Sequence, residues 1–313
     1  MLLMILRRAG VGILMVAVVA TVSFFLTFSG ASDAARAVVG QDATQEVVDA
    51  KAHELGLDRP VLGQYADWVA HALTGNLGTS FFDSTSVTEK ILQWLPVTLS
   101  IVVVAMLIIG VFSAVLGVVA AVRRGWLDRV IQFVSIGGHS LPGYWVAVLL
   151  VAWLSVGLHL FPATGYTPIG VSVSAWAWSI TLPVLALSIS GIASAAQQAR
   201  GAMIDTLRKD YIRTLRSRGL SERSVLYKHA LRNAAQPWLT ILALQFIGLL
   251  GGAVVIERVF ALPGLGTLAV DSTIQGDRPV VMGIVVFSSV MVVVVNLVVD
   301  VVQVILNPKV RVR

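Results

Sequence analysis

Long apolar blocks alternate with short polar segments along this chain. Six of these blocks approach or exceed 20 residues, at about 9–27, 96–122, 130–158, 175–196, 238–257 and 280–306. A helix needs about 20 mostly apolar residues to cross the hydrocarbon core of a membrane. The pattern therefore predicts an all-α polytopic membrane protein with six transmembrane helices, and it excludes a soluble fold with one large core.

Prolines and a polar cluster indicate where these helices begin or bend. Pro96 is expected to open the second block, because proline is favoured in the first turn of a helix. His139, Ser140 and Pro142 lie near the middle of the third block and predict a kink or break there. His139 and Ser140 are not expected to form a hydrolytic pair, since neighbours on a helix point about 100° apart and no glycine-flanked nucleophile turn is present.

Residues 30–95 form the longest polar segment. Amphipathic helices are predicted around Gln45–Gly56 and Val61–Leu73, and turn residues dominate Gly75–Ser80. The segment carries nine acidic and four basic residues, and Glu257 adds an acidic residue on another loop. A solvated cap outside the membrane is the simplest interpretation of this composition.

Charge is distributed unevenly over the polar segments. Of 313 residues 13% are charged, about half of the roughly 25% that is usual in soluble domains. Seventeen of the 23 Lys and Arg residues lie in four segments, 1–8, 123–129, 197–235 and 307–313. Cytoplasmic loops carry an excess of Lys and Arg, so both termini are predicted to be cytoplasmic and residues 30–95 extracytoplasmic. This distribution accounts for the net charge of +6 without nucleic acid as a partner.

The predicted topology divides the chain into four parts. Residues 1–29 comprise the N-terminal cytoplasmic residues and the first transmembrane helix, and residues 30–95 are the extracytoplasmic region. Residues 96–306 form a five-helix core with a cytoplasmic loop at 205–237, and 307–313 form a cytoplasmic tail. The start of the chain also fits a secretory signal peptide, although its apolar run exceeds the usual h-region of roughly 7–15 residues. A retained transmembrane helix is the preferred interpretation.

Several kinds of chemistry are excluded by residue usage. The chain has no cysteine, which excludes disulfides, thiolate metal ligands and cysteine nucleophiles. His53, His71 and His159 lack the spacing of a metal site, so no metal is expected. No Walker A pattern, GxxxxGK followed by Ser or Thr, occurs in the sequence, so the chain is not expected to hydrolyse ATP by that route.

The basic segment Asp210–Pro237 separates the fourth and fifth apolar blocks. A helix that continues from the fourth block is predicted over 205–218, with Gly219 as its stop. A second, short helix is predicted over Ser221–Leu231, with Glu222 in its first turn. An ordinary cytoplasmic loop with amphipathic helices on the lipid headgroups is the alternative interpretation.

The same segment resembles the cytoplasmic coupling loop of permease subunits of ATP-binding-cassette importers. In the dipeptide and oligopeptide branch this loop reads approximately DY-RTARAKGLSE--V--RHALRNAL-P. The matching positions are Asp210, Tyr211, Arg213, Thr214, Arg216, Gly219, Leu220, Ser221, Glu222, Val225, His229, Ala230, Leu231, Arg232, Asn233 and Pro237. The departures, none of which removes the glycine of the bend, are Leu215, Ser217, Arg218, Lys228 and Gln236.

The resemblance extends over the rest of the chain. Outside the loop, the matching residues are Leu57–Pro60, Tyr65, Gly75, Leu77–Ser80, Ser140–Pro142, Phe161–Pro162, Gly165–Tyr166, Glu257, Val259–Phe260, Pro263–Gly266, Asn296, Asp300 and Pro308. Asn76, Gln303 and Asn307 depart from the branch, in which Asp, Tyr and Asp are usual. By this resemblance the chain is identified as a permease subunit with the type I importer fold of six transmembrane helices.

The resemblance implies that the loop couples this chain to a separate ATPase. The residues expected to carry the coupling are Asp210, Arg213, Gly219, Leu220, Ser221, Glu222, Arg223, Val225, His229, Arg232 and Asn233. The helix Ser221–Leu231 is expected to insert into a cleft of the ATPase and to pass on its closure. No catalytic residue and no cofactor is expected in this chain, because ATP and Mg are expected on the partner subunits.

The implied function is that of a transport subunit, which imports di- and oligopeptides across the bacterial cytoplasmic membrane at the expense of ATP. The expected partners are a second homologous permease subunit, one or two ATP-binding subunits, membrane lipid, and an extracytoplasmic peptide-binding protein received on residues 30–95. Nickel, haem or glutathione as cargo are alternatives within the family. An ion-coupled secondary carrier is an alternative from another class, and it would need ionisable residues along a path through the membrane.

Small and polar residues inside two apolar blocks are candidates for the translocation path. Those in the fifth block share a helix face and are Gln245, Gly248 and Gly252. Close helix packing is an equally good explanation of the glycines. Those in the sixth block are Asn296 and Asp300, on one stripe with Gln303 and Asn307. Structural pairing of Asp300 with the coupling loop is preferred over a path lining.

Overall fold

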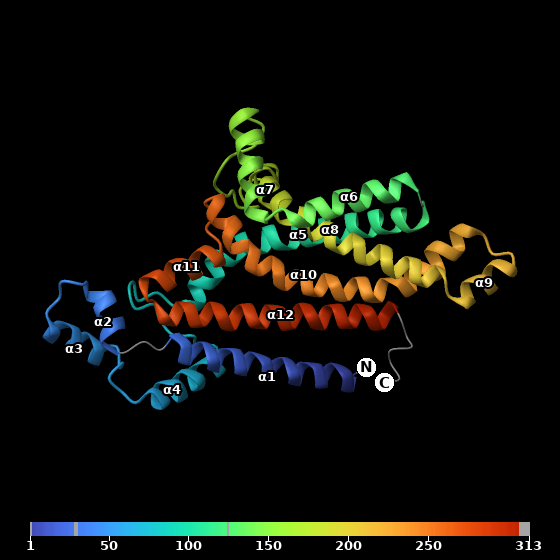
Figure 1. Cartoon of the computed structure of the whole chain (residues 1–313). Helices are drawn as coiled ribbons and strands as arrows, with labels where there is room; N and C mark the ends of the chain where they lie inside the picture. Colours follow the sequence, from blue (N-terminus) through green and yellow to red (C-terminus); the bar gives the residue numbers. More distant parts are fainter. Residues whose placement is uncertain (1, 28–30, 124, 307–313) are drawn as a thin grey trace. The chain divides into compact units, whose positions relative to one another are not determined.

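The structure, a computed structural model, describes residues 2–27, 31–123 and 125–306 (Figure 1). Within these residues there are helices and loops but no strand, apart from a single antiparallel bridge between Thr79 and Ser86. The chain divides into two compact units, described here as the N-terminal unit and the core unit. The predicted tail at 307–313, which includes Asn307, lies outside the described residues.

Several helical segments are long and apolar enough to cross a membrane. Within the described ranges they are Leu6–Thr27, Val87–Val122, Val173–Leu207, Ser224–Val259 and Arg278–Ile305. A bent pair, Asp128–Gly138 with Gly143–Gly157, adds one more if both parts belong to one span. The predicted all-α membrane fold is therefore confirmed. The described residues contain five candidate spans, or six if the bent pair is counted as one span.

The N-terminal unit consists of Leu3–Thr98 and Pro263–Val293. Its elements are α1 (Leu2–Thr27), α2 (Ala31–Val39), α3 (Gln45–Glu54), α4 (Val61–Leu73), the start of α5 (Val87–Val122), α11 (Leu265–Gln275) and the start of α12 (Arg278–Leu306). The two predicted amphipathic helices are confirmed as α3 and α4. The helices α2 and α11 were not predicted, because both are short and lie in segments that are rich in turn residues.

The second apolar block begins earlier than its proline. Pro96 lies inside α5, which starts at Val87, so the expectation that Pro96 opens this helix was wrong. Val87 and Ile91 are buried in a core shared with α11 and α12, which includes Leu265 and Val280. Burial of these side chains stabilises the additional helical turns and outweighs the hydrogen bond that a proline removes from a helix.

The core unit consists of Leu99–Leu262 and the end of α12 from Val294. Besides most of α5, its elements are α6 (Trp126–Ser140), α7 (Gly143–Leu150), η1 (Val151–Gly157), α8 (Val173–Leu207), α9 (Asp210–Ser217), η2 (Ser224–Ala230) and α10 (Leu231–Val259). The helix α8 is central, since 67% of its most apolar stretch is buried and α6, α7 and α10 all pack against it.

Small residues allow the close packing around α8. A Cβ atom at Gly117 of α5 would lie 2.5 Å from Cβ of Ala199 and 2.8 Å from the carbonyl oxygen of Ala196. The two backbones are therefore in direct contact, and only glycine fits at this position.

The kink predicted in the third block is confirmed. The helix α6 ends at Ser140, whose hydroxyl donates to the carbonyl of Ile136 at 2.9 Å, and α7 begins directly after Pro142. The helical parts Asp128–Gly138 and Gly143–Gly157 meet at 94°.

Candidate functional site

The segment predicted to be the coupling loop, called the loop below, begins with a break between two helices. The helix α8 ends at Leu207 and α9 begins at Asp210, because Lys209 has an extended backbone with φ −70° and ψ 145°. The prediction of one continuous helix over 205–218 was therefore wrong. The break turns Ile212 back toward Met203 of α8, in a core where both side chains are buried. A straight helix would leave this isoleucine exposed, so burial of its side chain favours the turn.

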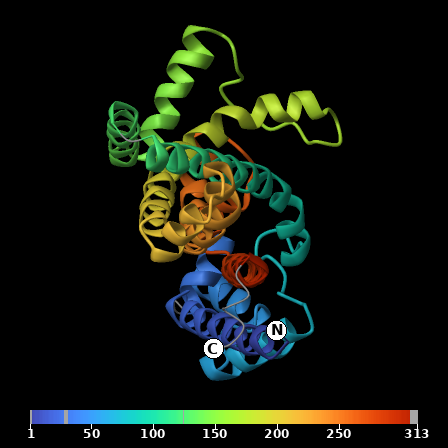
Figure 2. The same cartoon turned by 90° about the vertical axis from the view of Figure 1, so that its right-hand side faces the viewer.

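The loop has its own hydrophobic core. The helices α9 and η2 pack on each other at the ends of α8 and α10 (Figures 1 and 2). The buried members of this core are Ala121, Ala202, Met203, Ile212, Val225, Ala230 and Ala234. Half-buried leucines complete it, namely Leu207, Leu215, Leu220 and Leu226. The loop is consequently a packed extension of two membrane helices, and Val225 and Leu220 of the predicted set serve as its anchors.

Gly219 ends α9, as predicted. Its φ is 78°, in the left-handed region that favours glycine, and a Cβ atom there would meet nothing within 4 Å. The N–H of Gly219 donates to the carbonyl of Arg216 at 2.9 Å, and that of Leu220 donates to the carbonyl of Leu215 at 3.3 Å. The requirement for glycine is therefore a matter of backbone conformation rather than of space.

An ion pair closes the turn around Gly219. Arg216 donates from Nε to Oε1 of Glu222 at 2.7 Å and from Nη2 to Oε2 at 3.2 Å. Paired donors of this kind fix the relative orientation of the two side chains. Glu222 was predicted as a coupling residue but Arg216 was not. An arginine and a glutamate at equal distances before and after the glycine were the signal that could have revealed the pair.

The second helix of the loop does not end where predicted. The carbonyl of Ser221 accepts the N–H of Val225 at 3.0 Å, while its hydroxyl accepts that of Ser224 at 3.4 Å. The helix η2 then continues into α10, so that Ser224–Val259 is one helical segment of 36 residues with Pro237 inside it. A separate helix over Ser221–Leu231 was therefore wrong. Ala230, which is buried, lies at the junction of η2 and α10. Its backbone is helical, so the helix continues through this junction.

The outward face of the loop is polar and mostly basic. Its exposed residues include Lys209, Asp210, Arg213, Arg216, Arg218, Glu222, Arg223, Tyr227, Lys228, Arg232 and Asn233. Oδ1 of Asp210 lies 3.6 Å from Nη1 of Arg213, and 95% of the Asp210 side chain is exposed. A partner surface that complements this face would have to be acidic.

Polar contacts tie α9 to the first turn of α10. The side chains of Tyr211 and Asn233 are hydrogen-bonded, and burial raises the pKa of the Tyr211 phenol despite this bond. Asn233 also donates from Nδ2 to the carbonyl of the half-buried His229 at 2.9 Å. The side chain of Asn233 therefore holds parts of the loop together.

A second ion pair joins α6 to α8. Arg200 donates from Nε and Nη2 to the two carboxylate oxygens of Asp128, both at 2.6 Å, and Gln132 donates to Oδ1 at 3.1 Å. The side chain of Asp128 is only 13% exposed. Sequence reasoning missed this pair. The signal for it was a lone acidic residue in an otherwise basic turn.

A cavity of about 350 Å³ lies between α7, α8 and α10 in the core unit. Its lining consists of Gly143, Tyr144, Ala186, Leu187, Ser190, Gly191, Gln245, Gly248, Leu249, Gly252, Val255 and Ile256. All three path candidates of the fifth block, Gln245, Gly248 and Gly252, are therefore brought together at one cavity. Nearby, Gln245 donates to the hydroxyl of Ser194 on α8 at 2.8 Å.

The candidates of the sixth block lie elsewhere. Asn296 and Asp300 are half-buried on α12 and are not in the lining of this cavity. Gln303, on the same stripe, donates to the hydroxyl of Thr240 on α10 at 3.1 Å, so this part of the stripe packs against the fifth span. The pairing of Asp300 with the coupling loop stays a prediction.

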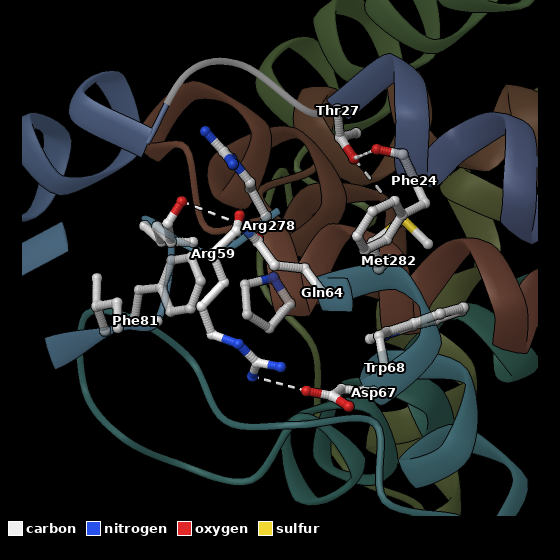
Figure 3. Close-up of a pocket in the computed structure, with 13 residues that line it drawn as sticks. Phe24, Thr27, Arg59, Gln64, Asp67, Trp68, Phe81, Arg278 and Met282 are labelled. Carbon is white, nitrogen blue, oxygen red and sulfur yellow. Dashed lines mark hydrogen bonds and ion pairs between the residues drawn. The ribbon is translucent and has the colours of Figure 1, made fainter. Parts of the chain in front are cut away.

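A smaller pocket of about 230 Å³ lies in the N-terminal unit (Figure 3). Arg59, Asp67 and Trp68 from the segment 30–95 line it together with Phe24 of α1 and Met282 of α12. An ion pair of 2.7 Å between Arg59 and Asp67 spans part of its wall. Within the described residues no three His, Asp or Glu side chains gather as a metal site requires.

Comparison with known proteins was made for the whole chain. The family described as "Binding-protein-dependent transport system inner membrane component" matches residues 107–312, and the family for its N-terminal part matches residues 1–102. A peptide transport system permease of Brucella abortus (strain 2308) is 39% identical over 309 residues, which cover 98% of each chain.

Two further relatives carry more specific names. The di/tripeptide transport system permease of Pseudomonas aeruginosa (strain UCBPP-PA14) is 35% identical over 333 residues, with 99% of each chain covered. The glutathione transport system permease of Escherichia coli O6:H1 is 35% identical over 295 residues, with 94% of each covered. A chain in a crystal structure of an amino acid ABC transporter has a TM-score of 0.53 at 16% identity, covers 69% of this chain and 94% of its own, and shares the fold.

Proposed function

The chain belongs to the family of binding-protein-dependent transport system inner membrane components, and on that premise we propose that it carries di- and oligopeptides into the cell as the permease subunit of an ATP-driven importer. As a family member it is a multi-pass protein of the bacterial inner membrane and works with other transporter components. The relatives named for peptides and for di- and tripeptides support this cargo, since they align over almost the whole chain.

The finer assignments are part of the same proposal. Both termini and the coupling loop lie in the cytoplasm, where the loop binds a separate nucleotide-binding subunit that holds ATP and Mg. A second homologous permease subunit completes the path, and an extracytoplasmic binding protein delivers the peptide to residues 30–95. The basic outward face of the loop and the absence of a Walker A pattern support the separate ATPase.

One observation above all supports the proposal that movement of the loop is passed on to the cavity. The helical segment Ser224–Val259 carries the coupling residues at one end and the cavity residues Gln245, Gly248 and Gly252 farther along. The core of the loop, with Ile212 and Val225 fully buried, ties this segment to α8, which lines the opposite side of the cavity. A displacement of the loop by the ATPase therefore moves both walls of the cavity as rigid bodies, because packed helices do not deform continuously.

Glutathione is the second candidate cargo. A glutathione permease matches this chain at 35% identity, the same value as the di- and tripeptide permease, and glutathione is itself a small peptide. Membership in the family of binding-protein-dependent transport components removes the support for an ion-coupled carrier. Uptake of labelled dipeptide and of labelled glutathione by cells that depend on this transporter distinguishes the two candidates.

The coupling proposal is tested with two glycines at positive φ, one inside the loop and one outside it. Gly219 and Gly125 both have positive φ, 78° and 111°, and a Cβ atom at either would meet nothing within 4 Å. Replacement by alanine strains both backbones, by about 1–2 kcal/mol in the left-handed region of Gly219 and by about 1–3 kcal/mol at Gly125, whose ψ is −138°. In the reconstituted transporter we expect Gly219→Ala to lower the peptide taken up per ATP hydrolysed several-fold, whereas Gly125→Ala keeps the ratio of the unmodified protein. Equal ratios in the two variants would contradict the assignment of the loop.

A simpler experiment tests the partners. Purification of the chain from native membranes should bring with it an ATPase and a second permease. If the purified chain transports peptide without any ATPase, the proposed partnership is wrong.

A further inference from the structure

The helix α4 has three distinct faces. On a helix of 3.6 residues per turn, Leu62, Ala66, Ala70 and Leu73 fall within about 80° of one another. All four are exposed, and Leu62 and Leu73 have 72% and 84% of their surface accessible. Such a row of exposed apolar side chains on a helix indicates a surface that is covered by something other than water.

A neighbouring face of α4 packs on the membrane-spanning helix α1. The ring of Tyr65 contacts the rings of Phe24 and Phe25, with centroids 5.2 Å and 5.6 Å apart, and its hydroxyl lies 2.7 Å from that of Thr21. Trp68 of α4 also lies against Phe24, at 6.0 Å between ring centroids. The unit that holds α1 and α4 therefore fixes the position of α4 along this span.

The contact with α1 sets the depth of α4. Thr21 lies six residues before the end of the span at Thr27, which corresponds to about 9 Å along a helix. Interfacial helices bury their apolar face about 5–10 Å into the boundary between headgroups and acyl chains. Tyrosine and tryptophan are enriched at that same level. The depth of α4 is therefore that of an interfacial helix.

The third face of α4 is polar and turns to the pocket of the N-terminal unit. Asp67 is paired with Arg59, and Gln64 donates to the carbonyls of Leu57 and Arg59 at 3.0 Å and 2.8 Å (Figure 3). His71 is exposed on this side, with its ring nitrogen 2.7 Å from the carbonyl of Asp67. Polar groups and apolar groups are thus separated on the helix, as an interface between water and lipid requires.

We propose that α4 lies in the outer interface of the membrane and that Leu62, Ala66, Ala70 and Leu73 contact the acyl chains of phospholipids. The occupant is lipid because the exposed stripe continues the lipid-facing surface of α1. Phe25 is the junction, since it is 44% exposed and at the same time in ring contact with Tyr65 of α4. The adjacent Leu26 is 80% exposed at the same level. This inference rests on the proposed orientation of α1, with its Thr27 end outside the cell, but not on a particular cargo.

The absence of cysteine makes the test direct. Single cysteines are introduced at Leu62, Ala66, Ala70 and Leu73, with His71 as a matched control on the polar face and Asp49 as a control on α3. Each is labelled with a nitroxide, and the chain is assembled with cysteine-free partner subunits in phospholipid vesicles. Collision of the label with oxygen, which partitions into lipid, is compared with collision with a water-soluble nickel chelate.

We expect a several-fold higher ratio of oxygen to nickel accessibility at the four stripe positions than at His71 and Asp49. Equal ratios at Leu73 and His71 would overturn the proposal, because both sides would then face water. Protection of the stripe from both reagents would also overturn it, since a protein surface would then cover α4. A stripe that is open to nickel and becomes protected only when the binding protein is added would assign it to that protein instead.

Discussion

Arg216 and Glu222 are bound to each other by two hydrogen bonds, of 2.7 Å and 3.2 Å, across the turn whose centre is Gly219. Their side chains are 41% and 60% exposed. An ion pair this exposed contributes roughly 0–1 kcal/mol to stability. Its significance lies in fixing the angle between α9 and η2, which a partner protein would push against.

Loss of this pair should impair coupling more than folding. Glu222→Gln keeps the shape of the side chain but removes its charge, so we expect a change in unfolding free energy below about 1 kcal/mol together with a several-fold lower uptake per ATP hydrolysed. The measurements are the thermal midpoint of the purified transporter and the ratio of uptake to hydrolysis. The reversed pair Arg216→Glu with Glu222→Arg restores the bridge and should recover part of the ratio. If the ratio of uptake to hydrolysis does not recover while the partners remain bound, the ion pair itself is not required for coupling.

The ion pair between Asp128 and Arg200 should behave in the opposite way. Both side chains are largely buried, at 13% and 26% exposure, and hydrogen bonds to charged groups contribute about 1.5–3 kcal/mol each. Asp128→Asn leaves Arg200 partly buried without its charged partner, and we expect a lower thermal midpoint and faster loss of protein in detergent. The control is Asp205→Asn on α8, the helix that carries Arg200. The side chain of Asp205 is exposed, so the thermal midpoint should not move. Equal midpoints for the two variants would refute a structural role of the pair.

Two adjacent glycines allow a role in the translocation path to be distinguished from a role in helix packing. Gly252 lines the cavity in the core unit and a Cβ atom there would lie 3.6 Å from Cδ2 of Leu187, whereas Gly251 is outside the lining with nothing within 4 Å. Gly252→Leu should fill part of the cavity and lower peptide uptake several-fold with the subunits still assembled. Gly251→Leu is the matched control, and its uptake should stay close to that of the unmodified protein. If Gly251→Leu lowers uptake as much as Gly252→Leu, the cavity is not the path.

His53 and Asp58 make the end of α3 sensitive to pH. The hydrogen bond to Asp58 and the charge of Asp58 raise the pKa of His53 above its ordinary value. A raised pKa in the folded state means that the pair stabilises this loop below the unfolded pKa of about 6.5, and that this contribution is lost as the pH rises through the folded value. We expect slower amide hydrogen exchange at Gly56 and Leu57 in mildly acidic than in mildly alkaline solution, after correction for intrinsic exchange rates.

The matched variants for this titration are Asp58→Asn and Asp42→Asn. The first should bring the pKa of His53 back toward its ordinary value, as measured by NMR of histidine-labelled protein. Asp42 is exposed on the same region and should leave the titration of His53 unchanged. A pKa of His53 that is the same in Asp58→Asn would show that the pair does not form in solution.

The sequence by itself determined the fold class and the family, and it predicted the coupling loop. Apolar blocks of membrane length predict helices whatever they pack against, since lipid leaves the backbone no other way to satisfy its hydrogen bonds. The stop at Gly219 and the kink before Pro142 were also readable, because both depend on local backbone chemistry. The helices α3 and α4 were readable as well, and in α4 the polar and apolar positions recur with helical periodicity.

Tertiary structure decided how the helices end and which side chains meet. The break at Lys209, the early start of α5 at Val87 and the continuation of η2 into α10 all follow from the burial of particular side chains, such as Ile212, Ile91 and Ala230. Burial depends on partners that are distant in the sequence, so no local pattern carries it. For the same reason the sequence placed Gln245 and Gly252 on one face of a helix, whereas only the packing of α8 and α7 against that face shows the cavity.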